Sequence, residues 1–240
     1  FSQAMSTVAA ITQATGSDFA ALEAQARLLG STTRFSATQA AEGMLYLARA
    51  GFDTDQVLGS IEGTLQLAQA GALDLGRAAD IASNILSGFR LDISETARVV
   101  DVLALAANSA NTDVDQLGEA MKFVAPVAAG MGVSLEEATA AIAALSNNGL
   151  QASLAGTGLR RVLSELESPS SKTRGILSDL GVTVDQVRPS MNNLTDVIAL
   201  LADRGLTTAQ ALEVFGDRGG PAFEVLSNSI PSIREMNSAL

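Results

Sequence analysis

Residues 74–89 read Asp-Leu-Gly-Arg-Ala-Ala-Asp-Ile-Ala-Ser-Asn-Ile-Leu-Ser-Gly-Phe, and the spacing of their apolar side chains decides the fold class. The apolar residues recur every three or four positions, at Leu75, Ala78, Ala82, Ile85 and Phe89. The polar residues fall on the opposite stripe, at Arg77, Asp80, Asn84 and Ser87. This is the pattern of an amphipathic α-helix with one buried face.

The same periodicity continues along the chain, in residues 114–124, 135–145 and 194–201. No stretch alternates apolar and polar residues as a half-buried strand does, and no hairpin turn joins two strand-like segments. The sequence therefore predicts an all-α fold without a sheet. We expect a compact array of about ten short amphipathic helices that stack as helical hairpins.

Helix starts follow a recurring pattern in which a capping residue stands three positions before Gln, Glu or Asp. The expected N-caps are Ser36, Asp53, Asp92, Thr112, Ser134, Thr183 and Thr207. In a capping box the first side chain accepts a hydrogen bond from the third backbone N–H of the helix, and the later side chain bonds back. Seven such starts predict at least seven helices.

The helix starts between positions 36 and 134 are also evenly spaced. Alternate starts pair 36 with 74, 53 with 92, 74 with 112 and 92 with 134. This spacing suits stacked helical hairpins, including a repeat architecture. Helices of ordinary length joined by short loops would recur at a similar distance without any repeat. The spacing alone leaves both interpretations open.

The sequence pattern changes after residue 150, where the predicted helices become shorter. Three Pro-containing segments in this part are predicted as loops: 168–171, 188–190 and 217–221. We expect an N-terminal helix over 1–18 that continues from an upstream segment, a helical core over 19–150, and a C-terminal helical subdomain over 151–240. Residues 93–110 carry only a thin polar stripe, so this helix is expected to be the most buried.

Composition excludes most catalytic chemistry. The 240 residues contain neither His nor Cys, which removes thiol chemistry, the commonest general base and the commonest metal ligand. The net charge of −11 disfavours direct binding of nucleic acid. The longest apolar run, 123–133, is too short to span a bilayer. We expect no cofactor, no metal site and no catalytic residues, and hence no enzyme.

Candidate chemical motifs have simpler structural interpretations. The paired acids at 53 and 55, 113 and 115, and 136 and 137 all fall in first helical turns, where the helix dipole favours them. Glu167-Ser168 resembles the Glu-Ser pair of lytic transglycosylases but lacks their glycine and aromatic context. The glycines of 149–158 lack the Lys of a phosphate-binding loop. We interpret Gly156 and Gly158 as close helix contacts, and we expect Arg161 to pair with Glu165.

Several stretches in order resemble the core region of TP901-type phage tail tape measure proteins. They are Leu28–Ala37, Tyr46–Phe52, Asp74–Asp80, Phe89–Asp92, Asp101–Ala104, Gly132–Glu137, Gly149–Arg160 and Val214–Gly219. The most specific piece includes Gly149, Gly156, Thr157, Gly158, Leu159 and Arg160. This sequence departs from the family where Ala152 replaces a usual Gly and Gly158 a frequent Ala. The resemblance covers about residues 19–230.

The resemblance implies a structural virion protein that acts in tail assembly, tail length determination and genome delivery. Its implied partners are tail tube and tail assembly chaperone proteins, and further copies of itself in the tail. It implies the tail lumen of the virion, and the host cytoplasm during assembly, as locations. Membrane contact is expected only during infection, and no catalytic residues are carried over.

A ruler should be extended, at about 1.5 Å per helical residue. Short, capped helices that each bury one face instead favour a compact module attached to the ruler. Two alternatives remain: a helical adaptor that presents a groove to a protein partner, and a membrane-active segment in which helices 93–110 and 123–148 insert during infection.

Overall fold

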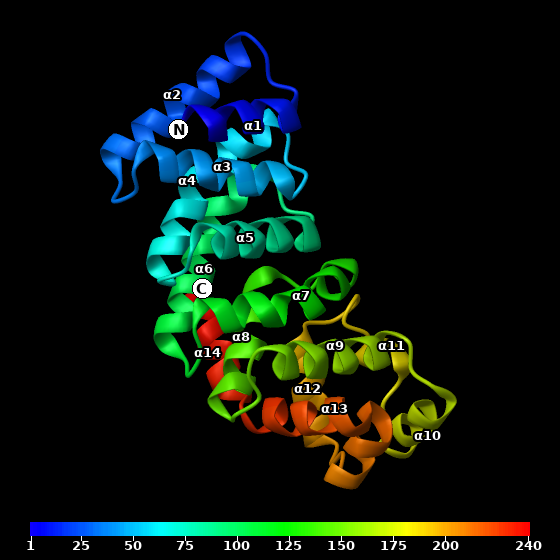
Figure 1. Ribbon diagram of the computed structural model, residues 1–240. Coiled ribbons are helices and arrows are strands. Elements are labelled where there is room, and N and C mark those ends of the chain that lie inside the picture. The colour runs from blue at the N-terminus through cyan, green and yellow to red at the C-terminus, as the bar shows by residue number, and fades with distance from the viewer. The chain divides into compact units, whose positions relative to one another are not determined.

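The computed structural model describes residues 1–240, and it is all-α, with no strand (Figure 1). Fourteen α-helices and one short 3-10 helix follow one another along the chain. The predicted all-α class is confirmed, but the helices outnumber the expected ten. One reason is that the expected helix over 1–18 is interrupted: α1 ends at Thr12, and α2 begins after Gly16, whose φ of 55° is left-handed.

Contacts between Cα atoms divide the chain into two compact units, residues 1–104 and residues 105–240. The division falls inside helix α6 (Thr96–Ser109) and not at residue 150. The subdomain boundary expected at 150 therefore does not coincide with this division, and a separate role for residues 151–240 stays a prediction.

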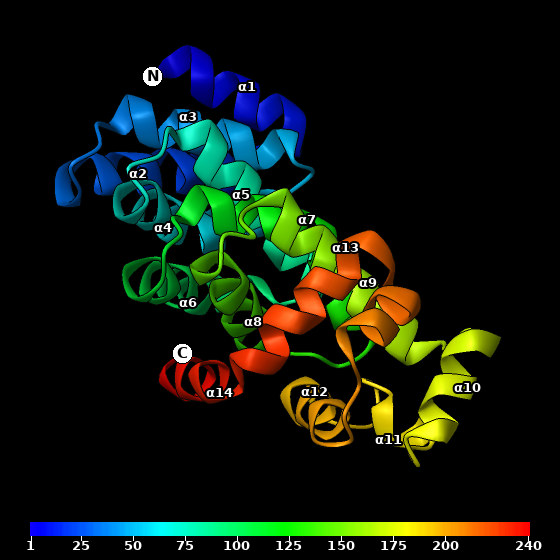
Figure 2. The ribbon, with the colours of Figure 1, turned by 90° about the horizontal axis from the view of Figure 1, so that it is seen from below.

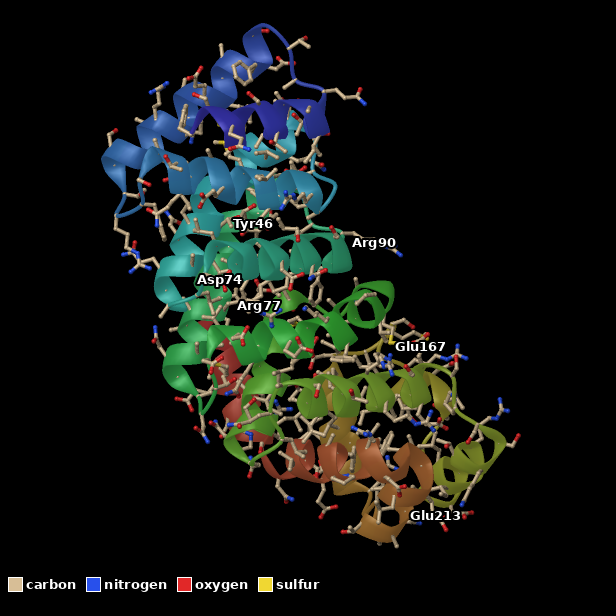
Figure 3. The ribbon with its side chains drawn as sticks, viewed as in Figure 1. Tyr46, Asp74, Arg77, Arg90, Glu167 and Glu213 are labelled. Carbon is tan, nitrogen blue, oxygen red and sulfur yellow. The ribbon has the colours of Figure 1, made fainter.

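Unit 1 is built around α3. Its helices are α1 (Ser2–Thr12), α2 (Ser17–Thr32), α3 (Ala37–Arg49), α4 (Thr54–Ala70), α5 (Leu75–Phe89), the 3-10 helix η1 (Ile93–Glu95) and the first part of α6. Helix α3 packs against α1, α2, α4 and α5. Glycines allow two of these contacts: a Cβ at Gly43 would lie 2.9 Å from Ile61, and the Tyr46 ring lies against Gly76 of α5 (Figure 3).

Unit 2 holds the remaining helices after α6. They are α7 (Val114–Gly130), α8 (Leu135–Asn147), α9 (Ser153–Glu167), α10 (Ser171–Asp179), α11 (Val184–Val187), α12 (Leu194–Asp203), α13 (Thr208–Asn228) and α14 (Ile230–Ala239). Helix α9 lies beside both α7 and α13 (Figures 1 and 2).

The most buried helix is α8, so the prediction that assigned this position to 93–110 is wrong. All residues of α8 are buried except Glu136 and Asn147. Helices α7, α9, α13 and α14 all contact it, and its many alanines let them approach. In α6, by contrast, Asp101 and Leu105 are exposed, so its thin polar stripe does not mark full burial.

Most expected caps stand at helix N-termini. Reciprocal capping boxes join Ser36 to Gln39, Asp53 to Gln56 and Thr207 to Gln210. Three further expected caps also form hydrogen bonds at a helix N-terminus. Ser134 accepts from the Glu137 N–H, Asp92 accepts from the Ser94 N–H at the start of η1, and Gln186 accepts from the Thr183 N–H.

The expected cap at Thr112 is wrong by one residue. Helix α7 is capped by Asp113, whose carboxylate accepts from the Gln116 N–H at 2.7 Å. A carboxylate is a stronger acceptor for the helix N-terminus than a hydroxyl, because it also complements the dipole. The Thr112 hydroxyl oxygen is left buried without a hydrogen-bond partner.

Two of the three expected loops in the C-terminal part are present, at 168–170 and 188–193. The loop expected over 217–221 is wrong, because these residues are helical in α13. The break in α13 comes one residue earlier, at Gly216, which has φ 71° and ψ −174°. The helix restarts after this glycine, and Pro221 is the fifth residue of the new segment, where it lacks one i→i−4 backbone hydrogen bond.

Candidate functional site

The glycine signature lies on α9, and its central feature is a backbone contact with α7. A Cβ built on Gly156 would lie 2.3 Å from the Ala120 carbonyl oxygen and 2.9 Å from the Ala120 Cα. Real Cβ atoms do not approach backbone this closely, and neither backbone can move without shifting a whole helix. The site therefore accepts only glycine at residue 156.

The second contact joins α9 to α13. A Cβ on Gly158 would lie 2.8 Å from the Ala222 Cβ and 3.1 Å from the Arg218 carbonyl oxygen. From the other side, a Cβ on Gly219 would lie 2.9 Å from Arg161 Cγ. Gly156 and Gly158 thus allow α7 and α13 to pack closely on α9 at the same time. Their cost in helix propensity, about 1 kcal/mol each relative to Ala, is offset by this packing.

Arg161 ties the broken part of α13 to α9. Its Nε donates to the Phe215 carbonyl oxygen at 3.2 Å, next to the left-handed Gly216. That carbonyl lies at the helix break, where the regular helical bonding of α13 is interrupted. Phe215 and Phe223 stack across the break, with ring centroids 5.0 Å apart. The guanidinium also pairs with Glu165 at 3.3 Å, as expected from their spacing.

Glu165 is the polar centre of the α9–α10 junction and is 6% exposed. Its carboxylate accepts from the Thr173 hydroxyl at 2.6 Å and from the Ser170 N–H at 3.0 Å. Burial of the carboxyl raises its pKa, but the hydrogen bonds from Thr173 and Ser170 and the charge of Arg161 outweigh burial. The pKa of Glu165 is therefore held below its ordinary value of 4.5.

Glu137 has the opposite electrostatics. This carboxylate, 7% exposed, leaves the first turn of α8 and accepts from the Thr195 N–H, at the N-terminus of α12, at 3.3 Å. Burial raises its pKa, the charge of Asp196 raises it further, and the backbone N–H groups of Thr195 and Leu194 only partly compensate. The pKa of Glu137 is therefore raised above its ordinary value. Its side chain links α8 to α12 and does not close a capping box with Ser134.

The other predicted signature residues surround these contacts without forming a reactive cluster. Leu159 is fully buried, Thr157 is half-buried and Arg160 is exposed. Gly149 lies in the turn after α8 with φ 86°, and a Cβ there would meet no atom within 4 Å. Its conformation therefore requires glycine, whereas space does not.

The acids that could suggest catalysis have structural partners. Glu167 accepts from the Ser190 hydroxyl at 2.8 Å and from its N–H at 3.1 Å, which fastens the 188–193 loop to the end of α9. Glu213 on α13 pairs with Lys172 on α10 at 3.6 Å (Figure 3). No three acidic side chains gather in a way that could hold a metal ion. None of the helices is both long and apolar enough for a membrane span.

Sequence reasoning missed three residues of this arrangement. Thr112 and Asp113 are adjacent and each can cap a helix, so the sequence alone did not indicate that Asp113 caps α7. An interruption of the helix was predicted over 217–221, whereas the break occurs one residue earlier, at Gly216. The hydrogen bond from Glu137 to α12 joins residues 58 apart in the sequence, so no local sequence pattern predicts it.

Comparison with known proteins identifies a family and two similar relatives. The family described as phage-related minor tail protein matches residues 23–217. The chain is 38% identical over 209 residues to the tape measure protein of Pneumococcus phage Dp-1, covering 86% of this chain and 18% of the relative. It is 35% identical over 217 residues to the probable tape measure protein of Escherichia phage P2, covering 87% and 27%. No solved structure matches.

We predict that Gly156→Ala destabilises the protein by about 3 kcal/mol or more, because the new methyl group overpacks against backbone. Gly175→Ala on α10 is the matched control, since a Cβ there meets nothing within 4 Å. The control should be neutral or stabilising by up to about 1 kcal/mol. Urea unfolding followed by circular dichroism measures both. Equal effects of the two substitutions would contradict the role of close packing at residue 156.

Two carboxylates should respond to pH with opposite signs. The ionised Glu165 stabilises the fold above pH 4.5, and this contribution is lost as pH falls through its lowered pKa. The ionised Glu137 costs stability above its raised pKa, and this cost disappears as pH falls toward 4.5.

At pH 7, Glu165→Gln should therefore destabilise by about 1–3 kcal/mol, whereas Glu137→Gln should be neutral or stabilising. Both differences from the wild type should shrink as pH falls. Free energies of unfolding measured between pH 3 and pH 8 test the pair. A wild-type-like pH dependence in both variants would show that neither carboxylate has the assigned environment.

Proposed function

Because the chain belongs to the family of phage-related minor tail proteins, which are structural components of phage tails, we propose that it is a folded module of a tape measure protein. The chain spans about a fifth to a quarter of the length of the curated relatives it matches. The whole protein would help to set tail length. This segment would act in tail assembly and genome delivery, attached to the part that measures length.

One observation carries the proposal: α9 holds together two helices that are far apart in the sequence. Gly156 contacts Ala120 on α7, and Gly158 contacts Ala222 on α13. In one continuous helix Ala120 and Ala222 would lie about 150 Å apart, at about 1.5 Å per residue. A segment in which both contact α9 cannot at the same time be an extended ruler.

The helix lengths agree with this interpretation. The longest, α13, has 21 residues and is broken at Gly216. Most of the longer helices bury one stripe against other helices of the same unit, and such helices are marginal when separated. We propose that the tail tube, the tail assembly chaperones and further copies of the chain contact the exposed faces. The protein would then occupy the host cytoplasm during assembly and the tail lumen in the virion.

The first test is tail length by electron microscopy after in-frame deletion of residues 36–130 from the full-length gene. The proposal predicts either no assembled tails, or tails of normal length that fail to deliver DNA. If these residues were part of an extended helical ruler, tails would assemble and shorten by about 140 Å. That shortening would contradict the proposal.

A second test leaves the chain length unchanged. Gly156→Leu should disrupt the packing of α9 and therefore abolish tail assembly or infectivity, while Gly175→Ala should leave both intact. An extended ruler would tolerate Gly156→Leu, because leucine favours helix and the residue count is the same. Normal tails carrying Gly156→Leu would show that the packed form is not needed.

A further inference from the structure

Two helical hairpins, one in each unit, correspond position by position. Helix α4 runs from Thr54 to Ala70, and α7 runs from Val114 to Gly130, so both ends are related by an offset of 60 in the numbering. The next helices begin at Leu75 and Leu135, at the same offset. Both ends of the first helix and the start of the second helix thus share one offset, with no gap between them.

The caps of the two hairpins also correspond. Asp53 caps α4 by accepting from the Gln56 N–H at 2.9 Å, and Asp113 caps α7 by accepting from the Gln116 N–H at 2.7 Å. The second helices are capped by Asp74 and Ser134, each on the third residue of its helix. The sequence Asp-x-Asp-Gln is identical at the two first caps.

The turns inside the hairpins have the same backbone. Ala72 and Gly132 are both left-handed, with φ 50° and 73°. The next N–H groups close the same bond back to the preceding helix: Leu73 to the Ala68 carbonyl at 2.9 Å, and Val133 to the Ala128 carbonyl at 3.0 Å. Ala72 stands where the second hairpin has Gly132, although a left-handed conformation is uncommon for alanine.

The buried positions agree as well. Six of the eight buried residues of α4 have a buried counterpart in α7 at the offset of 60. They are Val57, Ser60, Ile61, Thr64, Leu65 and Ala68, which correspond to Leu117, Ala120, Met121, Val124, Ala125 and Ala128. Helices of ordinary length joined by short loops would share their spacing by chance, but they would not also share caps, turn conformation and buried face.

The correspondence extends to the helix before each hairpin. The buried residues of α3 include Ala40, Ala41, Met44 and Leu47, and those of α6 include Val99, Val100, Leu103 and Ala106, at an offset of 59. Helix α6 (14 residues) is one residue longer than α3 (13 residues), and the loops that follow, 50–53 and 110–113, are equal in length. The offset of 60 is therefore restored at the next cap. The period is therefore three helices, and the spacing between alternate helix starts is not the repeat.

We propose that α3–α5 and α6–α8 are two copies of one three-helix repeat, with this offset as its period. The copies have diverged on one face of the third helix. Helix α8 carries Ala140, Ala143 and Ala144 where α5 carries Asp80, Ser83 and Asn84. Helix α14 packs on α8, which explains why small apolar residues replaced polar ones in the second copy.

The proposal is tested by removing and adding one period in the 240-residue chain. Deletion of 54–113 joins Asp53 to Val114-Asp115-Gln116 and rebuilds the capping box at the junction. Duplication of 54–113 places Asp113 before Thr54-Asp55-Gln56 and also keeps it. We expect both variants to show wild-type ellipticity per residue and one cooperative thermal transition.

A matched pair of deletions tests the register inside a helix. Deletion of 62–121 keeps the buried face of the hybrid helix, whereas deletion of 62–123 turns it by about 200°. Only the second should lose the cooperative transition. The repeat is overturned if the deletion of 54–113 and the duplication both fail to fold, or if deletion of 62–123 folds as well as deletion of 62–121.

Discussion

The closest constraint in unit 2 is the approach of α9 to the backbone of α7 at Gly156, where a single methyl group would collide with the Ala120 carbonyl oxygen. Because α9 is held this closely to α7, α13 can pack on the other side of α9 only if residues 158 and 219 have no side chain, and both are glycine. Across α9 and α13, the Arg161 side chain then donates to the Phe215 backbone carbonyl oxygen. This bond stabilises the helix break, where the carbonyl would otherwise lack its helical partner.

Local features of this fold were predictable from sequence, and tertiary features were not. Helix class and most caps follow from spacing and side-chain type, so Ser36, Asp53 and Thr207 could be placed without a structure. The glycines of 149–158 indicated close packing but not its partners, because Ala120 and Ala222 lie on helices that only the fold brings together. Burial of α8 and the bond from Glu137 to α12 depend on α14 and α12, which local periodicity does not reveal.

These contacts bear directly on how a tape measure protein uses this part of its chain. A ruler requires length to be proportional to residue number, whereas residues 105–240 fold back so that α9 contacts helices on either side of it in the sequence. The carboxylate of Glu137 on α8 holds α12 in this arrangement, and the carboxylate of Glu165 on α9 holds α10. The environments of the two carboxylates shift their pKa values in opposite directions. The segment therefore has the properties of a folded domain, as the proposed function requires.

The most direct test is a distance measured inside assembled tails. In the folded segment Arg234 on α14 and Asp196 on α12 pair at 2.8 Å, although they are 38 residues apart and both exposed. The segment has no cysteine, so Asp196→Cys and Arg234→Cys can carry spin labels. We expect a short distance between the labels by electron spin resonance of purified tails. A separation of about 57 Å, that of one continuous helix, would contradict the folded segment.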